Sequence, residues 1–284
     1  MSKKSETISF IELDKLIPFK DHPFLVKDDE QMQMLTESIR CVGVLVPAIV
    51  RPIDDNRYEL ISGHRRKRAS ELLGLSVMPV IVKDVDCDTA TVMMVDSNFQ
   101  REEILPSERA KAYKMKLEAI KRQGARNELT SDQLGQKLER KSSRDLIAEN
   151  SPDSSTQIQR YLRLNELIPE LLQMVDDRKI ALTPAAELSF LSREEQELLL
   201  LTIESEQATP SIYQAQRMKQ LSKEGQLTDD LILKIMTEQK KTECWNLILP
   251  MNRVTKYFPE SYTPQKMEEV IFSLLDRWNK SKSR

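Results

Sequence analysis

The sequence predicts an α+β N-terminal domain (a small mixed sheet with helices), then an all-α helix-turn-helix domain and a small, mostly helical C-terminal unit. Three observations predict this order. Short apolar runs alternate with helically spaced apolar residues up to about residue 104, which is typical of mixed structure. From residue 105 to about 240 the spacing is helical throughout, and aromatic side chains concentrate after residue 241. We therefore expect domains at residues 1–104, 105–240 and 241–284.

The elements of the N-terminal domain follow from apolar spacing and turn residues. Asp28 or Asp29 can cap a helix, and Gly43 can end it. Residues 54–56 have the composition of a turn between two strands. The expected strands are 7–10, 48–51, 58–62 and 80–82, the expected helices are 28–42, 64–73 and 88–95, and residues 17–23 are expected to form a loop.

The rest of the chain is predicted to be mainly helical. Residues 107–123 form an amphipathic helix that we expect Gly124 to end, and further helices fill the second domain. In the C-terminal unit, Thr263 and Pro264 are a helix cap and a first helical position. The apolar residues that follow keep helical spacing, which is typical of a core or a partner-helix face: Met267, Val270, Ile271, Leu274, Leu275 and Trp278.

The composition argues against several classes of protein. The 284 residues include 43 Lys and Arg against 45 Asp and Glu, a net charge of −2, so any DNA site must be a local basic patch. Three separated cysteines, no Cys-x-x-Cys pair and two histidines argue against structural zinc and a disulfide framework, and indicate a reducing compartment. No apolar run approaches the roughly 20 residues of a membrane span. We expect a soluble cytoplasmic protein without membrane contact.

A basic box follows the third expected strand and reads Gly63-His64-Arg65-Arg66-Lys67-Arg68-Ala69. Its cations lie at the N-terminus of a helix, where the helix dipole disfavours positive charge by about 0.3–1 kcal/mol each. A bound phosphate would remove this conflict, because backbone N–H groups and guanidinium groups would point at one anion. The alternative is a solvated basic face, the usual fate of a run of charges.

This box resembles the Gly-Glu-Arg-Arg-x-Arg-Ala box of ParB-type partition proteins. Two further motifs follow the order and spacing of that family. Residues 96–101, Asp-Ser-Asn-Phe-Gln-Arg, resemble its Glu-Asn-x-Gln-Arg box, and residues 43–47, Gly-Val-Leu-Val-Pro, resemble its Gly-x-x-Gln-Pro segment. The resemblance covers about residues 7–190.

The resemblance implies a CTP site with Mg²⁺. Arginines of the box would lie along the triphosphate, Gly63 would permit close backbone approach, and Asn98 would help to hold the metal. The nucleotide-binding residues that it implies are Gly43, Pro47, Gly63, His64, Arg65, Arg66, Arg68, Asn98, Gln100 and Arg101.

Three departures from the family bear on hydrolysis. His64 and Ser97 replace two glutamates, and Val46 replaces a glutamine. The loss of two carboxylates removes candidates for metal ligation or water positioning. We therefore expect nucleotide binding with weak or absent hydrolysis, a switch and not a metabolic enzyme, and we assign no catalytic residue. Sulfiredoxin chemistry on this fold is disfavoured because no cysteine lies between Gly63 and His64, and a small-molecule phosphotransferase is the rival enzyme class.

Two short helices predict a DNA-binding motif. A helix at 142–150, a turn at 151–153 and a helix at 155–164 capped by Ser154 have the order of a helix-turn-helix, whose second helix enters the major groove. There Gln can pair with adenine and Arg with guanine. The expected DNA-binding residues are Lys141, Ser143, Arg144, Ser155, Thr156, Gln157, Gln159, Arg160 and Arg163. The alternative is an ordinary helical hairpin with a polar face.

Residues 160–169 resemble the segment after the ParB recognition helix, whereas residues 183–186 replace the family's glycine-histidine box. The resemblance implies a partition protein on double-stranded DNA, associated with the nucleoid or a plasmid, with a ParA-type ATPase as a possible partner. We expect a homodimer joined through the segment after Trp245, and a modest DNA affinity that falls with salt. The rivals are a transcriptional regulator of the same fold without clamp loading and an interaction adaptor.

Overall fold

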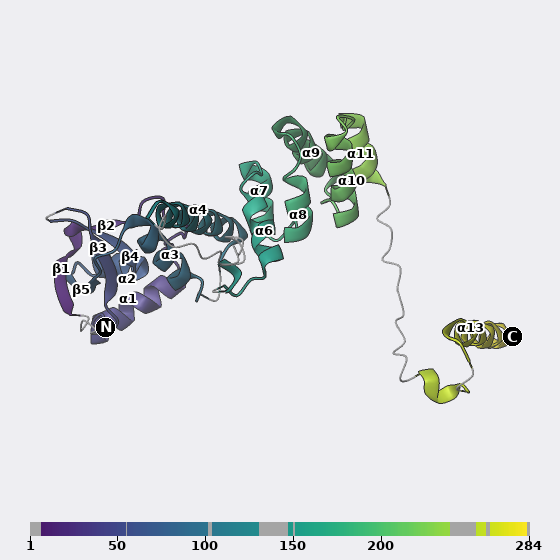
Figure 1. The fold of residues 1–284 in the computed structure, drawn as a ribbon, viewed down its shortest axis with the longest axis horizontal. Coiled ribbons are helices and arrows are strands. Elements are labelled where there is room, and N and C mark those ends of the chain that lie inside the picture. The colour runs from purple at the N-terminus through teal and green to yellow at the C-terminus, as the bar shows by residue number, and fades with distance from the viewer. Residues whose placement is uncertain are drawn as a thin grey trace. The chain divides into compact units, whose positions relative to one another are not determined.

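The structure is a computed structural model that describes residues 7–54, 56–101, 104–130, 147–149, 151–238, 254–259 and 262–282. Contacts divide the chain into one unit that ends at Glu238 and a second that begins at Gln239. The predicted fold class is confirmed: a mixed sheet with helices precedes a helical region (Figure 1). The predicted boundary between residues 104 and 105 falls just before a long helix. That helix packs on elements that precede the boundary and on elements that follow it.

The N-terminal region is built on a five-stranded mixed sheet. Its strands are β1 (Ile8–Glu12), β2 (Leu16–Pro18), β3 (Ala48–Pro52), β4 (Tyr58–Ser62) and β5 (Val77–Val82). They lie in the order β1-β5-β3-β4-β2; β1 with β5 and β3 with β4 are antiparallel, and the other two pairs are parallel. One face of the sheet is closed by buried aliphatic side chains such as Val50, Leu60 and Val80.

Two sequence predictions about strands were wrong. Residues 17 and 18 begin the predicted loop at 17–23, but together with Leu16 they form β2, because three residues that pair with β4 suffice at a sheet edge. Strand β5 begins at Val77 and includes Pro79, which was expected to lie before the strand. Both errors concern segments whose strand character comes from pairing with neighbours and not from their own residues.

Three helices cover the sheet. They are α1 (Glu30–Val42), α2 (His64–Leu72) and α3 (Cys87–Asn98). The Asp29 carboxylate accepts the Met32 N–H and caps α1, which confirms one of the two predicted caps. The cap of α3 is Asp86, two residues before the predicted start, and Asp88 is instead buried. Figure 1 shows α1, α2 and α3 gathered against the strands.

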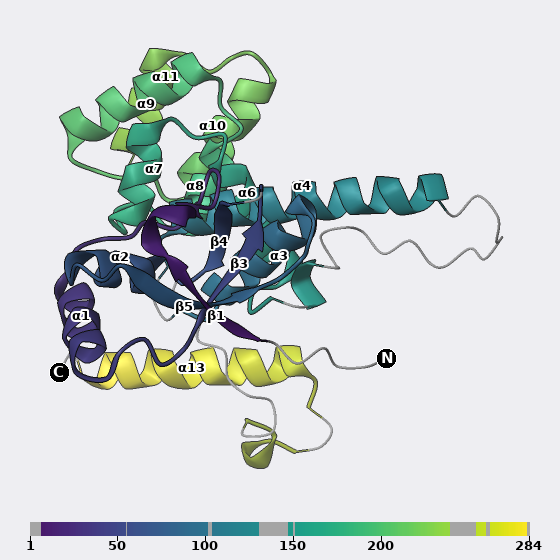
Figure 2. The same cartoon turned by 90° about the vertical axis from the view of Figure 1, so that its left-hand side faces the viewer.

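Helix α4 (Pro106–Thr130) connects the sheet region to the following helices. It packs on α3, where Arg122 bonds to Asp88 and Gln123 to Thr89. Gly124 does not end this helix, contrary to the prediction: it lacks the positive φ of a helix-ending glycine, and the helix continues to Thr130. Figure 2 shows the C-terminal part of α4 running past α3.

The following helices share one apolar core. They are α6 (Ser155–Leu164), α7 (Pro169–Asp176), α8 (Leu182–Leu188), α9 (Arg193–Glu206), α10 (Ile212–Lys223) and α11 (Asp229–Thr237). Leu164, Leu171 and Leu188 lie in that core with residues of the later helices. Capping boxes at Ser192 and Ser211 fix the starts of α9 and α10.

The C-terminal unit contains a short 3₁₀ turn, η2 (Thr255–Tyr257), and α13 (Pro264–Lys282). The predicted start of α13 is confirmed, and Thr263 accepts the Lys266 N–H. Met267 is buried, whereas Leu274, Leu275 and Trp278 are at least half exposed. The start of the expected C-terminal unit, residues 241–253, lies outside the described residues. No helix in the described part of the chain is long and apolar enough to cross a membrane.

Candidate functional site

The turn between β4 and α2 is specific for glycine. Gly63 has φ +108°, and a Cβ placed there would lie 2.7 Å from the Cβ of Ala48 on β3. The first intrahelical bond of α2 runs from Lys67 N to Gly63 O, so the N–H groups of residues 64–66 are not used within the helix. A backbone that approaches this closely and ends in free N–H groups can receive an anion.

The cations of the basic box have partners within the protein. Arg65 donates to Gln31 Oε1 (3.1 Å) and lies 3.6 Å from Asp29 Oδ1. Arg68 donates from Nε (3.1 Å) and Nη2 (2.6 Å) to the two carboxylate oxygens of Asp28. From the sequence, these charges were expected to be stabilised either by a bound phosphate or by solvent. The structure adds a third, the carboxylates at the start of α1.

Arg66 has a structural role in this conformation. Its Nη1 donates to the backbone oxygens of Val46 and of Pro47 (2.7 Å), and so joins α2 to the 43–47 segment. Burial lowers the pKa of Arg66 below its usual value, although a guanidinium stays charged. The arginine thus contacts two backbone carbonyls in place of an anion, and Gly43 and Pro47 belong to the segment that it holds.

His64 is buried and stacks on His22, with 3.8 Å between the ring centroids. Its Nε2 accepts the Phe19 N–H (3.4 Å), and His22 Nδ1 donates to Phe24 O (2.7 Å). Burial lowers the pKa of His22 to about 4 and that of His64 to about 3, so both rings are neutral near pH 7. The predicted nucleotide contact from His64 is therefore limited to its backbone or to a neutral ring.

Arg101 is a cation near the basic box whose charge is not paired with a carboxylate among the described residues. Among the described residues its guanidinium has no hydrogen bond or ion pair, and it lies 5.7 Å from the Phe24 ring centroid. Burial, then the charge of Arg65, lowers its pKa. An anion bound between two cations that repel each other beside a helix N-terminus would stabilise both charges. Gln100, also predicted, is exposed beside them.

Asn98 is positioned by α3. It is 4% exposed, and its Nδ2 donates to Met94 O (2.8 Å), which leaves the amide oxygen as the group that could face a metal. The neighbouring Asp96 carboxylate is bound by Lys116. Within the described residues no cluster of three or more His, Cys, Asp or Glu side chains could hold a metal alone.

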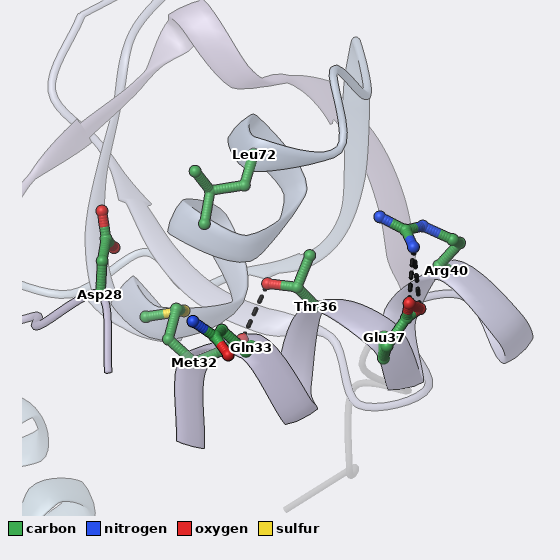
Figure 3. Close-up of a pocket in the computed structure, with 7 residues that line it drawn as sticks. All are labelled: Asp28, Met32, Gln33, Thr36, Glu37, Arg40 and Leu72. Carbon is green, nitrogen blue, oxygen red and sulfur yellow. Dashed lines mark hydrogen bonds and ion pairs between the residues drawn. The ribbon is translucent and has the colours of Figure 1, made fainter. Parts of the chain in front are cut away.

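A shallow cleft of about 490 Å³ lies between α1 and α2. Figure 3 shows Asp28 at one end, the ion pair of Glu37 and Arg40 at the other, and Leu72 above. The cleft meets the basic box only through Asp28 and contains none of its arginines. The cleft is therefore separate from the arginines of the basic box.

Helix α6 has the cap and exposed face predicted for the second helix of a helix-turn-helix. Ser154 accepts the Gln157 N–H, and Ile158 and Leu164 are buried. Thr156, Gln157 and Gln159 are exposed, whereas Ser155 and Arg160 are half-buried. Of the first helix only residues 147–149 are described, so Lys141, Ser143 and Arg144 lie outside the described residues.

Arg163 is anchored more firmly than the sequence indicated. Its Nε donates to Ser189 Oγ (3.0 Å) and its Nη2 to Ser189 O (2.6 Å). Its guanidinium also lies over the ring of Phe190, 3.8 Å from the centroid. The side chain is therefore held against the α8–α9 connection.

A buried network that the sequence analysis missed fixes the turn before α6. Asp153 is 7% exposed and accepts hydrogen bonds from Arg109 (3.0 and 3.3 Å) and Tyr113 (2.7 Å). The Tyr113 hydroxyl also contacts Ser151 Oγ (2.5 Å), and burial raises the pKa of that hydroxyl. Helix α4 supplies Arg109 and Tyr113, so α4 holds the turn that presents α6. No local sequence signal marks these four residues as neighbours.

Comparison with known proteins agrees with this geometry. Residues 1–99 match the ParB N-terminal domain family. The nucleoid occlusion protein of Geobacillus sp. (strain WCH70) is 32% identical over 200 residues, which cover 70% of this chain and 64% of that protein. The chain thus spans less than two thirds of the length of this relative.

Two solved structures also resemble the chain. C-terminally truncated chromosome-partitioning protein ParB from Caulobacter crescentus, complexed to the centromeric parS site, is 19% identical, with a TM-score of 0.45 over 80% of this chain and 98% of that one. The same protein complexed with CTP-γ-S is 24% identical, with a TM-score of 0.32 over 64% and 92%.

The mixed sheet, the glycine turn and the basic helix define a ParB-type N-terminal domain. Residues 1–99 of this chain form a domain of the ParB N-terminal domain family. The proteins similar to this chain include nucleoid occlusion proteins.

Proposed function

We propose that this protein is a ParB-like DNA-binding protein that recognises a specific DNA site through α6 and is gated by a CTP-type nucleotide. One observation carries the proposal: a single unit contains both a ParB N-terminal domain and a capped helix with exposed Thr156, Gln157 and Gln159. These side chain types form hydrogen bonds with base edges in the major groove. The buried network of Arg109 and Asp153 supports it, because a reading helix must be held rigidly.

The nucleotide site would use the N-terminus of α2. The free N–H groups after Gly63, with Arg65 and Arg101, would receive phosphate oxygens. Arg68 would join once it leaves Asp28. For Mg²⁺, the residues present offer the Asn98 amide oxygen as a single protein ligand, which fits an ion held mainly by phosphates and water. Bound Mg²⁺ would neutralise phosphate charge.

Hydrolysis is expected to be weak or absent. The family places glutamates at two positions that are occupied here by His64 and Ser97. His64 is buried and neutral, and the Ser97 hydroxyl donates to Met94 O (2.9 Å). Neither side chain offers a carboxylate to a metal or a water. Turnover of CTP above that of an Arg65→Ala variant would contradict this.

The cellular role would be the retention of a dimer at a DNA site on the nucleoid or a plasmid. A symmetric site requires two copies of α6, and the exposed apolar side of α13 would join them. The relatives' name favours nucleoid occlusion, and partition with a ParA-type ATPase is the second role. A clamp on closed circular DNA that survives high salt would distinguish either role from a plain transcriptional regulator.

Nucleotide binding is tested first. CTP, ATP, GTP and UTP are titrated with Mg²⁺ against wild type, Arg65→Ala and Arg57→Ala. Arg57 is the matched control because it forms an ion pair with Asp54 (2.6 Å) on the β3–β4 turn, away from the box. CTP-selective binding that only Arg65→Ala loses supports the proposal. Absence of binding to every nucleotide removes the gate and leaves a simple DNA-binding protein.

DNA reading is tested by selecting preferred sequences from a random duplex pool. The variant Gln157→Ala should change the selected sequence, whereas Gln173→Ala should not. Gln173 lies on α7 and bonds to Asp177 (2.9 Å), so it is an exposed glutamine with a structural partner. If wild type selects no sequence, specific recognition by α6 is excluded.

A further inference from the structure

A cluster of cations surrounds one exposed aromatic ring beside α6. Phe190, between α8 and α9, is 41% exposed. The guanidinium of Arg163 lies 3.8 Å from the ring centroid, the ammonium of Lys219 lies 3.7 Å from it, and that of Lys223 lies 5.8 Å from it. We name Arg163, Phe190, Lys219 and Lys223 the Phe190 cluster.

The ring brings together charges that would otherwise repel. Arg163 and Lys219 both lie within 4 Å of the Phe190 centroid. Each face attracts a cation through the ring quadrupole. Glu187 binds Lys219 (2.6 Å) and is the carboxylate of the cluster. Three positive charges against one negative leave a net positive surface.

Two of the three cations of the cluster, Arg163 and Lys219, are held in place before any ligand arrives. Arg163 bonds to Ser189, which is 3% exposed and donates in turn to Ala186 O (2.8 Å). Lys219 and Lys223 share α10, which packs on α8. Fixed cations bind an anion with little loss of side-chain freedom. Lys223 is exposed and has no ion pair among the described residues.

The position of the cluster matches the edge of a DNA groove. Arg163 lies one helical turn after Gln159, about 6 Å along α6. The major groove is about 12 Å wide, so a helix with Gln159 near its centre places Arg163 close to the bordering backbone. Residues in the N-terminal part of a reading helix face bases, which leaves the later residues for phosphates.

We propose that the Phe190 cluster binds backbone phosphates of double-stranded DNA beside the groove that α6 reads. This inference rests on the proposed function, because it assumes that α6 meets DNA. It adds Lys219 and Lys223 from α10, and Phe190 as the residue that positions the cations. The cluster contributes affinity without sequence preference, because every sequence offers the same phosphates.

The test compares Lys223→Gln with Lys234→Gln on the full chain. Both are exposed lysines in the last turn of a helix, so each variant loses the same favourable charge at a helix end. The affinity for a duplex of random sequence is measured over a series of salt concentrations. The slope of log K against log salt is negative. We expect Lys223→Gln to make it less steep by about 0.9, the value for one phosphate contact, and Lys234→Gln to leave it unchanged.

The outcomes separate the two proposals. If wild type binds and both variants keep its slope, the phosphate contact is excluded and DNA binding by α6 stands. If wild type does not bind duplex DNA even at low salt, the proposed function fails and this inference with it. If Lys234→Gln makes the salt dependence as shallow as Lys223→Gln does, the lysines act only through the overall positive charge. A specific phosphate contact at the Phe190 cluster is then excluded. A Phe190→Leu variant adds a check, since it keeps all charges but should weaken binding at each salt concentration.

Discussion

The two carboxylate oxygens of Asp28 each accept a hydrogen bond from the guanidinium of Arg68, at 3.1 and 2.6 Å. This ion pair holds the pKa of Asp28 below its usual value. A nucleotide triphosphate at the basic box would compete with this carboxylate for Arg68. Asp28 lies outside the cap of α1, which is Asp29, so its charge can be removed without loss of the cap.

We therefore expect Asp28→Asn to bind CTP more tightly, by about two- to fivefold, the range typical of one exposed ion pair. Calorimetry with Mg²⁺ measures this affinity. The control is Asp54→Asn, which removes a carboxylate from another exposed pair, with Arg57, away from the box. Equal or weaker CTP binding by Asp28→Asn would show that Asp28 does not compete with the nucleotide.

Gly63→Ala should destabilise the N-terminal region strongly. The new Cβ would meet Ala48 Cβ at 2.7 Å, at a φ of +108° that side chains rarely adopt. We expect a loss of about 2–4 kcal/mol in the free energy of unfolding, measured in urea. Gly74→Ala is the control, because Gly74 also has positive φ (+69°) but nothing within 4 Å, and it should lose only about 1 kcal/mol. Equal losses in the two variants would exclude the close contact as the cause.

Asp153→Asn should loosen the turn that presents α6. The buried carboxylate binds Arg109 and Tyr113, so its neutralisation leaves a cation and a hydroxyl with poorer partners. We expect a loss of about 1–3 kcal/mol in stability and weaker DNA binding. A double-mutant cycle with Arg109→Ala measures the coupling. Additive effects of the two substitutions would contradict a shared network.

The stacked histidines predict a pH dependence of stability. His22 and His64 have pKa values of about 4 and about 3 in the folded protein, below the usual 6.5. At pH values between these folded pKa values and 6.5, the unfolded chain therefore binds more protons than the folded protein does. The free energy of unfolding falls as the pH is lowered from about 6.5 towards 4. We expect a loss of about 2–3 kcal/mol per histidine by pH 4.5. Thermal melts of His22→Gln should show a flatter acid side, and an unchanged profile would exclude His22 as a source.

Local residue chemistry was sufficient to predict most elements. Caps at Asp29 and Ser154 and the turn at Gly63 were readable because each depends on residues within four positions. The prediction that Gly124 ends α4 was wrong because a glycine in an exposed helix costs only about 1 kcal/mol, which the packing of α4 offsets. Strand β2 was not predicted because its extended conformation depends on pairing with β4.

The sequence by itself determined the fold class, the order of its elements and the basic box with its glycine turn, because these depend on spacing and on neighbours along the chain. The tertiary structure decided which charges are available. Asp28 lies 40 residues before Arg68 and neutralises it, and Ser189 lies 26 residues after Arg163 and fixes it. Such partners are set by how helices and strands pack, and no local pattern encodes them. The Phe190 cluster became a candidate anion site only in the folded structure for the same reason, whereas Arg101 was already expected from the sequence.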